Sequence, residues 1–505
     1  MDVIPILLNP RIQTLNMAHN DLRSVEQAFV FYDKLEKLDL SHNNIEGVGI
    51  NNFISQKRLQ ELHLAHNNLT ELLLKSFSGL SDLTLLDLSY NSIQEIPVGL
   101  LSDVPTIKFL LLNHNKLHTI SMHAFKSQQF LHVLDFCDNY FRDVPTKAIK
   151  ELFTLKVLNL CRNRLTTIES RAFPNEALNK LSLESNSINK IETAAFNHLH
   201  NLQKLDLSNN LLGKVPTLAI SVLLMLETLL LSKNNFTSIS TNAFHSLVNL
   251  KILEISRCSQ LQDVHPTALS KCSRLHTLRM AHNPLLTLIS PGLLASLPKL
   301  RILDLSGNGL QGLSESSLPW ASLASLDMRD NPLRCNCSLR WLANLLAQPN
   351  ASVSTPDVQC HSPNKFKDIY LSRLTSQELQ CPGNLPIIVG VAVLSTSLVL
   401  LVALSLIICR YRRRREREKL PKSWAPSSLE PWPPEDLLYD HRLIAPQNDY
   451  IHHHPHQWHL ANNTHSLKDT HSKYIYNHVP QHQIIVDDYA YQTYASIKKV
   501  PVTEV

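Results

Sequence analysis

The sequence predicts an α/β fold: a curved solenoid, or horseshoe, that ends in a disulfide-bonded cap and continues into one transmembrane helix and a disordered tail. Three observations lead to this prediction. An eleven-residue pattern, written LTLLDLSYNSI at 83–93, recurs along residues 1–332. Four cysteines lie in residues 333–382, and residues 385–409 form an apolar run that precedes the tail, residues 410–505.

Composition narrows the possible function classes. Of the 505 residues, 44% are hydrophobic but only 6% are aromatic, so the core is aliphatic, as expected where one small unit repeats. The net charge is only +5, and much of the basic charge lies in the run RYRRRREREK that begins at Arg410. Charge that is confined to one place argues against nucleic acid binding.

The recurring pattern is LxxLxLxxNxL with a step of about 24 residues, which is typical of leucine-rich repeats. At 83–93, the three leucines are expected to face inward from a short parallel strand, and Asn91 is expected to bond the backbone where the chain turns. A row of such asparagines predicts a hydrogen-bonded spine. About fourteen units carry Asn20, Asn43, Asn67, Asn91, Asn115, Asn139, Asn163, Asn186, Asn210, Asn234, Asn283, Asn308 and Asn331, or Cys258, at this position. Phenylalanines recur on the expected convex side: Phe29, Phe53, Phe77, Phe125, Phe173, Phe196 and Phe244.

Function must then lie on the variable positions of the strands, which form an extended concave sheet in a solenoid. Most of these positions are polar. Five neighbouring positions are apolar and are predicted to contact a protein ligand: Leu85, Phe109, Leu111, Val133 and Val157. The alternative is that β-branched and aromatic side chains merely suit a pleated surface.

A second column of residues directly precedes the asparagine in five successive repeats: His19, His42, His66, Tyr90 and His114. Stacked imidazoles would titrate together between neutral and acidic pH and give a pH-sensitive surface. Drift within a duplicated repeat explains the column as well. A metal site is not expected, because strands lie about 4.8 Å apart and no carboxylate or thiolate completes a tetrahedral set.

The stretch NPLRCNCSLRWL opens a region with four cysteines: Cys335, Cys337, Cys360 and Cys381. Four cysteines allow three pairings, which the sequence alone leaves open. The region resembles the C-terminal cysteine-rich flank of extracellular leucine-rich repeat proteins, which has CxC, a helix containing a tryptophan, and two spaced cysteines. That resemblance implies bonds from Cys335 to Cys360 and from Cys337 to Cys381, with Trp341 covering the last repeat.

Two further pairs of cysteines lie inside the repeats. Cys258 and Cys272 belong to one repeat and would either pair or stay reduced. Cys137 and Cys161 occupy the same outward position on neighbouring strands. No bond is expected between them, because direct neighbours on strands rarely meet disulfide geometry.

The apolar run from Pro386 to Cys409 is long enough for a helix through a hydrocarbon core of about 30 Å. Arginines follow it from Arg410 onward, so the positive-inside rule places the C-terminus in the cytoplasm. Four glycosylation sequons precede it, at Asn68, Asn235, Asn336 and Asn350, and the cysteines also indicate an oxidising compartment. The predicted location is the plasma membrane, as a single-pass type I protein.

The first residues, MDVIPILLNPRIQTL, show neither the pattern of a signal sequence nor a cysteine-rich N-terminal cap. We therefore expect the chain to be incomplete at its start. Insertion by the membrane helix without a signal is the alternative.

The tail is rich in Pro, His, Tyr and Ser and is expected to be disordered. Its end resembles a class I ligand of PDZ domains, so a cytoplasmic PDZ-domain scaffold is a predicted partner; the residues are Thr503, Glu504 and Val505. Three tyrosines are candidates for phosphorylation: Tyr489, Tyr491 and Tyr494.

The order of repeats, cysteine flank, span and short tail resembles the leucine-rich repeat transmembrane adhesion and receptor proteins, among them the leucine-rich repeat transmembrane neuronal proteins. The resemblance implies a cell-surface protein that binds an extracellular protein ligand on its concave face. Toll-like receptors share such ectodomains, so an innate-immunity receptor or co-receptor without its own signalling domain is the alternative. No enzyme, cofactor or metal centre is expected, because no nucleophile, base and orienting group assemble at a recognisable spacing.

Overall fold

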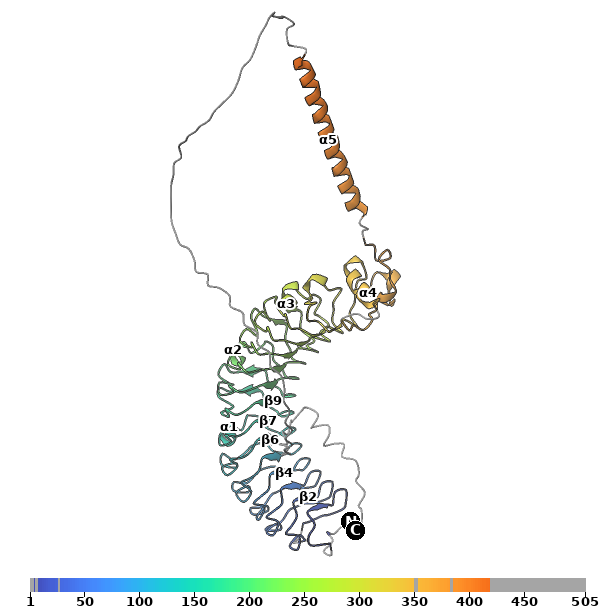
Figure 1. The fold of residues 1–505 in the computed structure, drawn as a ribbon. Coiled ribbons are helices and arrows are strands. Elements are labelled where there is room, and N and C mark those ends of the chain that lie inside the picture. Colours follow the sequence, from blue (N-terminus) through green and yellow to red (C-terminus); the bar gives the residue numbers. More distant parts are fainter. Residues whose placement is uncertain (1–3, 5–7, 26–27, 349–352, 382–384, 418–505) are drawn as a thin grey trace, which may run out of the picture. The chain divides into compact units, whose positions relative to one another are not determined.

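The structure is a computed structural model that describes residue 4 and residues 8–25, 28–348, 353–381 and 385–417. The chain divides into two compact units, Met1–Ile408 and Cys409–Val505. The first unit contains a curved solenoid and its cap (Figure 1). Within the second unit, the described residues are the end of one long helix.

A 14-stranded parallel sheet with its strands in chain order lines the inner side of the solenoid (Figure 1). Neighbouring strands pair leucine with leucine, as Leu86 with Leu110 and Leu110 with Leu134. The strands are β1 Thr14–Asn16, β2 Lys37–Asp39, β3 Glu61–His63, β4 Leu85–Asp87, β5 Phe109–Leu111, β6 Val133–Asp135, β7 Val157–Asn159, β9 Lys180–Ser182, β11 Lys204–Asp206, β12 Thr228–Leu230, β14 Ile252–Glu254, β16 Thr277–Arg279, β17 Ile302–Asp304 and β18 Ser325–Asp327. The parallel solenoid that the repeat predicts is confirmed.

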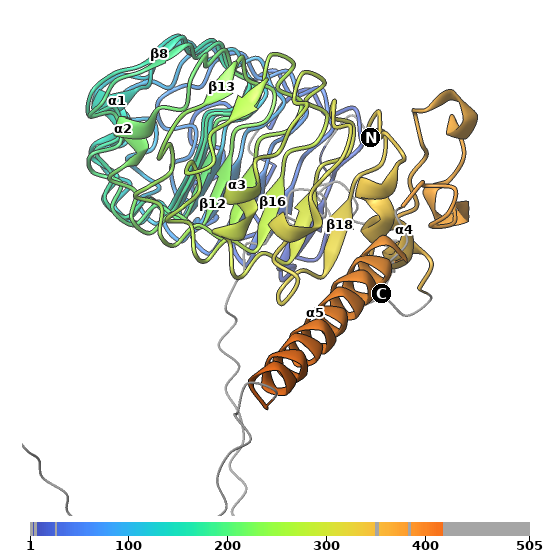
Figure 2. The ribbon, with the colours of Figure 1, turned by 90° about the horizontal axis from the view of Figure 1, so that it is seen from above.

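The outer side of the solenoid consists of loops and very short elements. Three short helices lie there: α1 Thr146–Ile149, α2 Thr217–Ile220 and α3 Pro291–Ala295. Two strand pairs add to them, β8 Thr167–Ile168 with β10 Lys190–Ile191, and β13 Ser238–Ile239 with β15 Asp263–Val264. Figure 2 shows β8 and β13 on the side opposite β12, β16 and β18.

The core follows from the period of the sequence. In each strand of the large sheet the middle residue is a buried leucine, and in most strands the residues on either side of it are partly exposed. The phenylalanines of the convex column are buried, and successive rings stack where the repeats follow one another, as Phe29 on Phe53 at 5.8 Å between ring centroids. These leucines and phenylalanines therefore form the core, and the residues on either side of each strand leucine remain available to contact other molecules.

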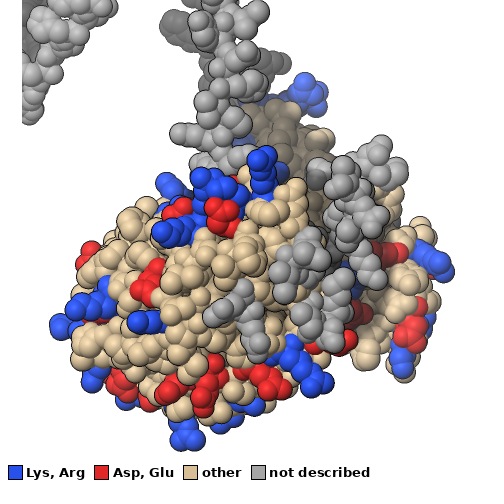
Figure 3. Space-filling model, turned by 90° about the horizontal axis from the view of Figure 1, so that it is seen from below, with Lys and Arg blue, Asp and Glu red and all other residues tan. Residues whose placement is uncertain are grey.

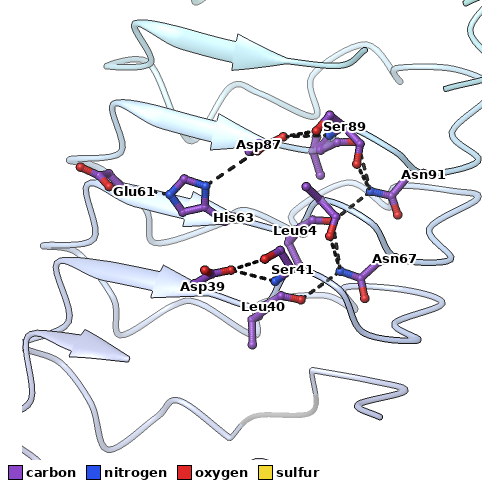
Figure 4. A network of polar contacts seen from close by, with 12 residues as sticks. Asp39, Leu40, Ser41, Glu61, His63, Leu64, Asn67, Asp87, Ser89 and Asn91 are labelled. Atoms are coloured by element: carbon purple, nitrogen blue, oxygen red, sulfur yellow. Dashed lines mark hydrogen bonds and ion pairs between the residues drawn. The ribbon is translucent and has the colours of Figure 1, made fainter. Parts of the chain in front are cut away.

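The asparagine spine is present, and Figure 4 shows two of its members. Asn67 Nδ2 donates to the carbonyl oxygens of Leu40 at 3.0 Å and Leu64 at 3.1 Å. Its Oδ1 accepts the Ile45 N–H at 2.9 Å. One amide thus satisfies backbone groups of two successive repeats where the chain leaves the strand, and the same arrangement recurs at Asn91.

The cap covers the last strand and contains helix α4, Arg340–Leu346, with short 3₁₀ helices at Cys337–Leu339, Asn364–Phe366 and Leu371–Arg373. Disulfides join Cys335 to Cys360 and Cys337 to Cys381, which is the pairing that the resemblance implies. Trp341 lies on α4, is 8% exposed, and donates its indole N–H to Leu313 O at 3.1 Å. Ser354 extends the ladder beyond β18, since the Leu326 N–H donates to Ser354 O at 3.0 Å.

The expectation that Cys137 and Cys161 stay unbonded is wrong, because a disulfide joins them. Both cysteines follow their strands, at a point where the parallel chains hold the two Cα atoms only 4.5 Å apart. That separation lies inside the range that a disulfide bridges. Cys258 and Cys272 are both buried and unbonded, and burial raises the pKa of their thiols to about 11 and about 12.

The long helix α5 runs over Leu385–Arg417, and its part Ala392–Arg415 is long and apolar enough to cross a membrane. Within the described residues this is the one helix of that kind. The predicted PDZ ligand and phosphotyrosine candidates lie outside the described residues: Thr503, Glu504, Val505, Tyr489, Tyr491 and Tyr494.

Candidate protein-binding face

Four of the five predicted contact residues form one continuous row across neighbouring strands. Leu85, Phe109, Val133 and Val157 pair in register as the first residues of β4, β5, β6 and β7. All four side chains are half-buried on the concave face. Leu111 lies in the next row, in register with Asp87 and Asp135. We call the first four residues the apolar row.

Charged side chains at β2–β4 are paired among themselves, as Figure 4 shows. His63 lies between Glu61 and Asp87, with ring nitrogens 3.7 Å and 3.8 Å from their carboxylate oxygens. Burial disfavours the imidazolium, but hydrogen bonding to Asp87 and attraction from the nearby carboxylates outweigh it and raise the pKa of His63. For Asp87, burial is outweighed by hydrogen bonds from His63 and Ser89, so the pKa of this carboxyl is lowered. Lys37 pairs with Glu61 at 2.8 Å.

A buried carboxyl lies beside the apolar row. Asp135 is 1% exposed, and burial raises its pKa to about 6 although it accepts the Cys137 N–H at 2.9 Å and an Asn159 Nδ2–H at 3.3 Å. This carboxyl is thus largely committed to groups of its own chain. It presents little negative charge to a partner.

The histidine column forms a continuous ring stack, which we call the ring ladder. Its members are His19, His42, His66, Tyr90 and His114, with successive ring centroids 4.2, 4.1, 3.9 and 4.0 Å apart. Each residue has a positive φ between 53° and 57°, so all five rings leave the backbone in the same direction. Within the described residues no group of His, Cys, Asp or Glu could hold a metal ion.

Ionisation of three histidines of the ring ladder is disfavoured in the folded state. Burial, and then the neighbouring imidazole, lower the pKa of His42 and of His66, although Asp39 and Asp87 favour their charged forms. Burial also lowers the pKa of His114, even with Asp138 Oδ2 only 2.9 Å from its Nδ1.

Acidification is therefore expected to destabilise the repeats that carry the ladder. Histidines with a folded pKa below the usual value of about 6.5 bind fewer protons than the unfolded chain, so stability falls as pH drops from about 7 through the folded pKa values. The His42→Tyr variant should lose less thermal stability than the original between pH 7.5 and 5, and Tyr90→His should lose more. Equal losses in all three proteins would contradict this role.

The sequons occupy different environments. Asn68 and Asn235 are exposed and each directly follows an asparagine of the spine. Asn336 is half-buried, and its Oδ1 accepts the Ser338 N–H at 2.9 Å. Asn350 lies outside the described residues.

Sequence reasoning missed a set of residues at the edge of the apolar row. Lys108, His132 and Lys156 directly precede β5, β6 and β7. The aromatic side chains of Phe130 and Phe153 are exposed in the repeats that contain His132 and Lys156. The three basic residues recur once per repeat, which was a signal in the sequence, but they hold the second position of the pattern, whereas contacts were expected at the third and fifth positions.

Known proteins share the repeat. The description "Leucine rich repeat" applies to matches over residues 34–55, 57–117, 153–212, 176–223, 224–285 and 249–310. Leucine-rich repeat and fibronectin type-III domain-containing protein 4 of Rattus norvegicus is 32% identical over 132 residues, which cover 24% of this chain and 20% of that protein. Vasorin of Homo sapiens is 30% identical over 127 residues, 25% of this chain and 19% of vasorin. The aligned part thus spans about a fifth of these relatives.

Solved structures agree on the fold. The mouse RP105/MD-1 complex matches with a TM-score of 0.64 and 26% identity, over 72% of this chain and 62% of that chain. The APL1 leucine-rich repeat domain matches with a TM-score of 0.55 and 23% identity, over 70% of this chain and 88% of that chain, which shows the shared fold alone. Together, the repeat matches, the parallel sheet and the capped end show a leucine-rich repeat solenoid with a disulfide-bonded C-terminal cap.

Proposed function

We propose that this protein is a single-pass type I adhesion or receptor protein of the plasma membrane whose concave face binds a protein partner. The observation that carries the proposal is the apolar row, in which four half-buried apolar side chains lie in register on adjacent strands. Apolar clusters that keep part of their surface in contact with solvent mark partner sites, because burial of that surface is the main favourable term in association. Figure 3, which views the molecule from below, shows Lys and Arg interspersed with Asp and Glu among broad areas that carry neither.

Placement in the membrane is supported by several features of the chain. Helix α5 has the length and composition of a membrane span, and arginines occupy its C-terminal end. The disulfides and the exposed sequons at Asn68 and Asn235 favour an extracellular position for the solenoid.

Replacing two residues of the apolar row should abolish most of the binding to a partner. We expect Phe109→Ser with Val133→Ser to weaken binding at least about tenfold, since the few residues at the centre of an interface that dominate its energy each cost more than about 1 kcal/mol when truncated. The measurement is the binding of a panel of purified cell-surface ectodomains to cells that display the full chain. Ile302→Ser is the matched control, because Ile302 is the first residue of the distant strand β17. A partner that binds the double variant and the original equally would contradict the site.

Glycosylation tests the orientation of the chain. The full chain made in animal cells should lose apparent mass when treated with an N-glycosidase, and Asn68→Gln with Asn235→Gln should remove part of that change. Asn44→Gln is the control, because Asn44 is equally exposed but is not part of a sequon. Absence of any mass change would contradict an extracellular solenoid.

A second candidate is a receptor or co-receptor of innate immunity. It rests on the resemblance of the repeats and cysteine flank to the ectodomains of Toll-like receptors, and the match to the mouse RP105/MD-1 complex shows the same fold in a chain solved within a complex. Deleting Val505 separates the two candidates, since that residue ends the proposed PDZ ligand, Thr503 to Val505. Loss of clustering at the cell surface supports the adhesion protein, whereas unchanged surface behaviour with ligand-driven cytokine output supports the immune receptor.

A further inference from the structure

Three basic residues follow one edge of the apolar row. The Lys156 N–H donates to His132 O and the His132 N–H donates to Lys108 O, both at 2.9 Å, so the three residues are direct neighbours on successive repeats. Both lysines are exposed. Burial, followed by the positive charges of Lys156 and Lys108, lowers the pKa of His132. We call these residues the basic edge.

The two lysines of the basic edge carry charge that no carboxylate of their own chain compensates in the described residues. At the same position in another repeat, Lys251 does have such a partner and pairs with Glu227 at 2.7 Å. Among the described residues, no carboxylate lies within ion-pair distance of Lys108 or Lys156. Positive charge without an internal partner therefore lies next to the apolar row.

The opposite flank of the row offers no matching negative charge. Asp135 is buried with its carboxylate bonded to its own chain, and Asp87 is bonded to His63 and to Ser89, whose hydroxyl donates at 2.7 Å. A partner that lies over the row therefore meets apolar side chains in the centre and available positive charge on one side.

The apolar surface continues past the basic edge. Phe130 is 55% exposed and Phe153 is 71% exposed, although aromatic side chains of this size are usually buried. Thr154 Oγ1 donates to Gln129 O at 2.8 Å and to Leu131 O at 3.0 Å, so the loops that carry the two rings are tied together. Rigid exposed aromatics beside a basic strip are typical of the residues that dominate binding energy.

We propose that this face binds an extended segment of a partner polypeptide that has an apolar centre and carboxylates beside it, with the carboxylates on the basic edge. The inference rests on the proposed function and adds the chemistry of the partner. Four strands about 4.8 Å apart give a row about 14 Å long, which about four or five extended residues would cover. The partner segment cannot join the sheet as a further strand, because β4 to β7 are already paired on both sides, so side chains make the contacts.

The test is a displayed library of random peptides, selected on the full chain in lipid nanodiscs and counter-selected on the Phe109→Ser, Val133→Ser variant. Enriched peptides should place Asp or Glu next to aromatic and aliphatic residues. Lys108→Glu with Lys156→Glu should lower the affinity of these peptides at least about tenfold, because charge pairs across an interface set specificity. Selection on that variant should enrich basic peptides instead. Lys126→Glu with Lys147→Glu is the matched control, because it makes the same charge change at two exposed lysines away from the concave face, one in the loop between β5 and β6 and one in α1.

The outcomes separate the inference from the proposed function. The inference is overturned, and the concave site stays in place, if the enriched peptides need Phe109 and Val133 but show no excess of acidic residues. The same holds if these peptides bind the Lys108→Glu, Lys156→Glu variant with unchanged affinity. If no peptide distinguishes the original chain from the Phe109→Ser, Val133→Ser variant, both the site and its partner chemistry are overturned. A further variant, Phe153→Ser, should weaken acidic peptides that extend past the row and should keep the thermal midpoint of the original, since Phe153 is exposed.

Discussion

Replacing Asn115 by alanine is expected to destabilise the solenoid by about 3 kcal/mol. Asn115 is 5% exposed, and its Nδ2 donates to Leu88 O at 2.9 Å and Leu112 O at 3.2 Å. Its Oδ1 accepts the Ile93 N–H at 2.9 Å. Alanine would leave the buried Ile93 N–H without a partner, which costs roughly 1–3 kcal/mol. It would also remove one of the two side-chain bonds to each carbonyl, since Leu88 O keeps Asn91 and Leu112 O keeps Asn139, and each lost bond adds about 1 kcal/mol.

Denaturant unfolding of the full chain in detergent measures this loss, and hydrogen exchange locates it. Protection should fall first in the repeats next to Asn115, because each repeat of a solenoid is stabilised by its neighbours. Asn44→Ala is the control, since Asn44 is exposed and should change stability by no more than about 0.5 kcal/mol. Equal unfolding midpoints for the Asn115→Ala and Asn44→Ala variants would show that the asparagine spine does not stabilise the solenoid.

The sheet could be predicted from the sequence because the repeat encodes it twice. Leucines at fixed offsets determine which side chains point inward, and an asparagine marks the place where each strand ends. The first and third residues of β4 to β7 are therefore partly exposed as the spacing predicts, except Asp135, the third residue of β6, which is buried. Ligand binding on this face stays a prediction, because the repeat period indicates which side chains face outward but not what they bind. The residues concerned are Leu85, Phe109, Leu111, Val133 and Val157.

The bond between Cys137 and Cys161 was missed for a geometric reason. Sequence reasoning placed the two cysteines on the strands, where side chains of neighbouring residues point the same way and seldom reach each other. They lie instead just beyond β6 and β7, where the chain begins to turn and the Cα atoms approach to 4.5 Å. A local change of backbone direction of this kind is not visible in the repeat pattern.

Charge compensation is also hidden from the sequence. Lys251 and Lys156 occur at the same place in their repeats, yet only Lys251 has a carboxylate, Glu227, within 4 Å. Whether an edge charge is paired depends on the neighbouring repeat and on side-chain direction. The uncompensated charge of the basic edge is therefore evident from the structure and not from the sequence.

The cap should contribute more stability than its disulfides alone. Cys335 and Cys360 are 25 residues apart in sequence, and Cys137 and Cys161 are 24 apart. Loops of this length imply almost the same loss of chain entropy, about 3.5 kcal/mol for either bond. The two bonds differ in surroundings, because Cys335 belongs to the cap that covers β18, whereas Cys137 lies between inner repeats.

Removing each bond in turn isolates the contribution of the cap. We expect Cys335→Ser with Cys360→Ser to destabilise the full chain more than Cys137→Ser with Cys161→Ser, because opening the cap also exposes the apolar face of the last repeat. Trp341 packs edge-to-face on Trp320 with ring centroids 5.6 Å apart, so a red shift of tryptophan emission should accompany the first variant and not the second. Equal losses of stability, with tryptophan emission unchanged in both variants, would mean that the cap disulfide acts only by lowering the entropy of the unfolded chain. The cap would then add no stability by burying the last repeat.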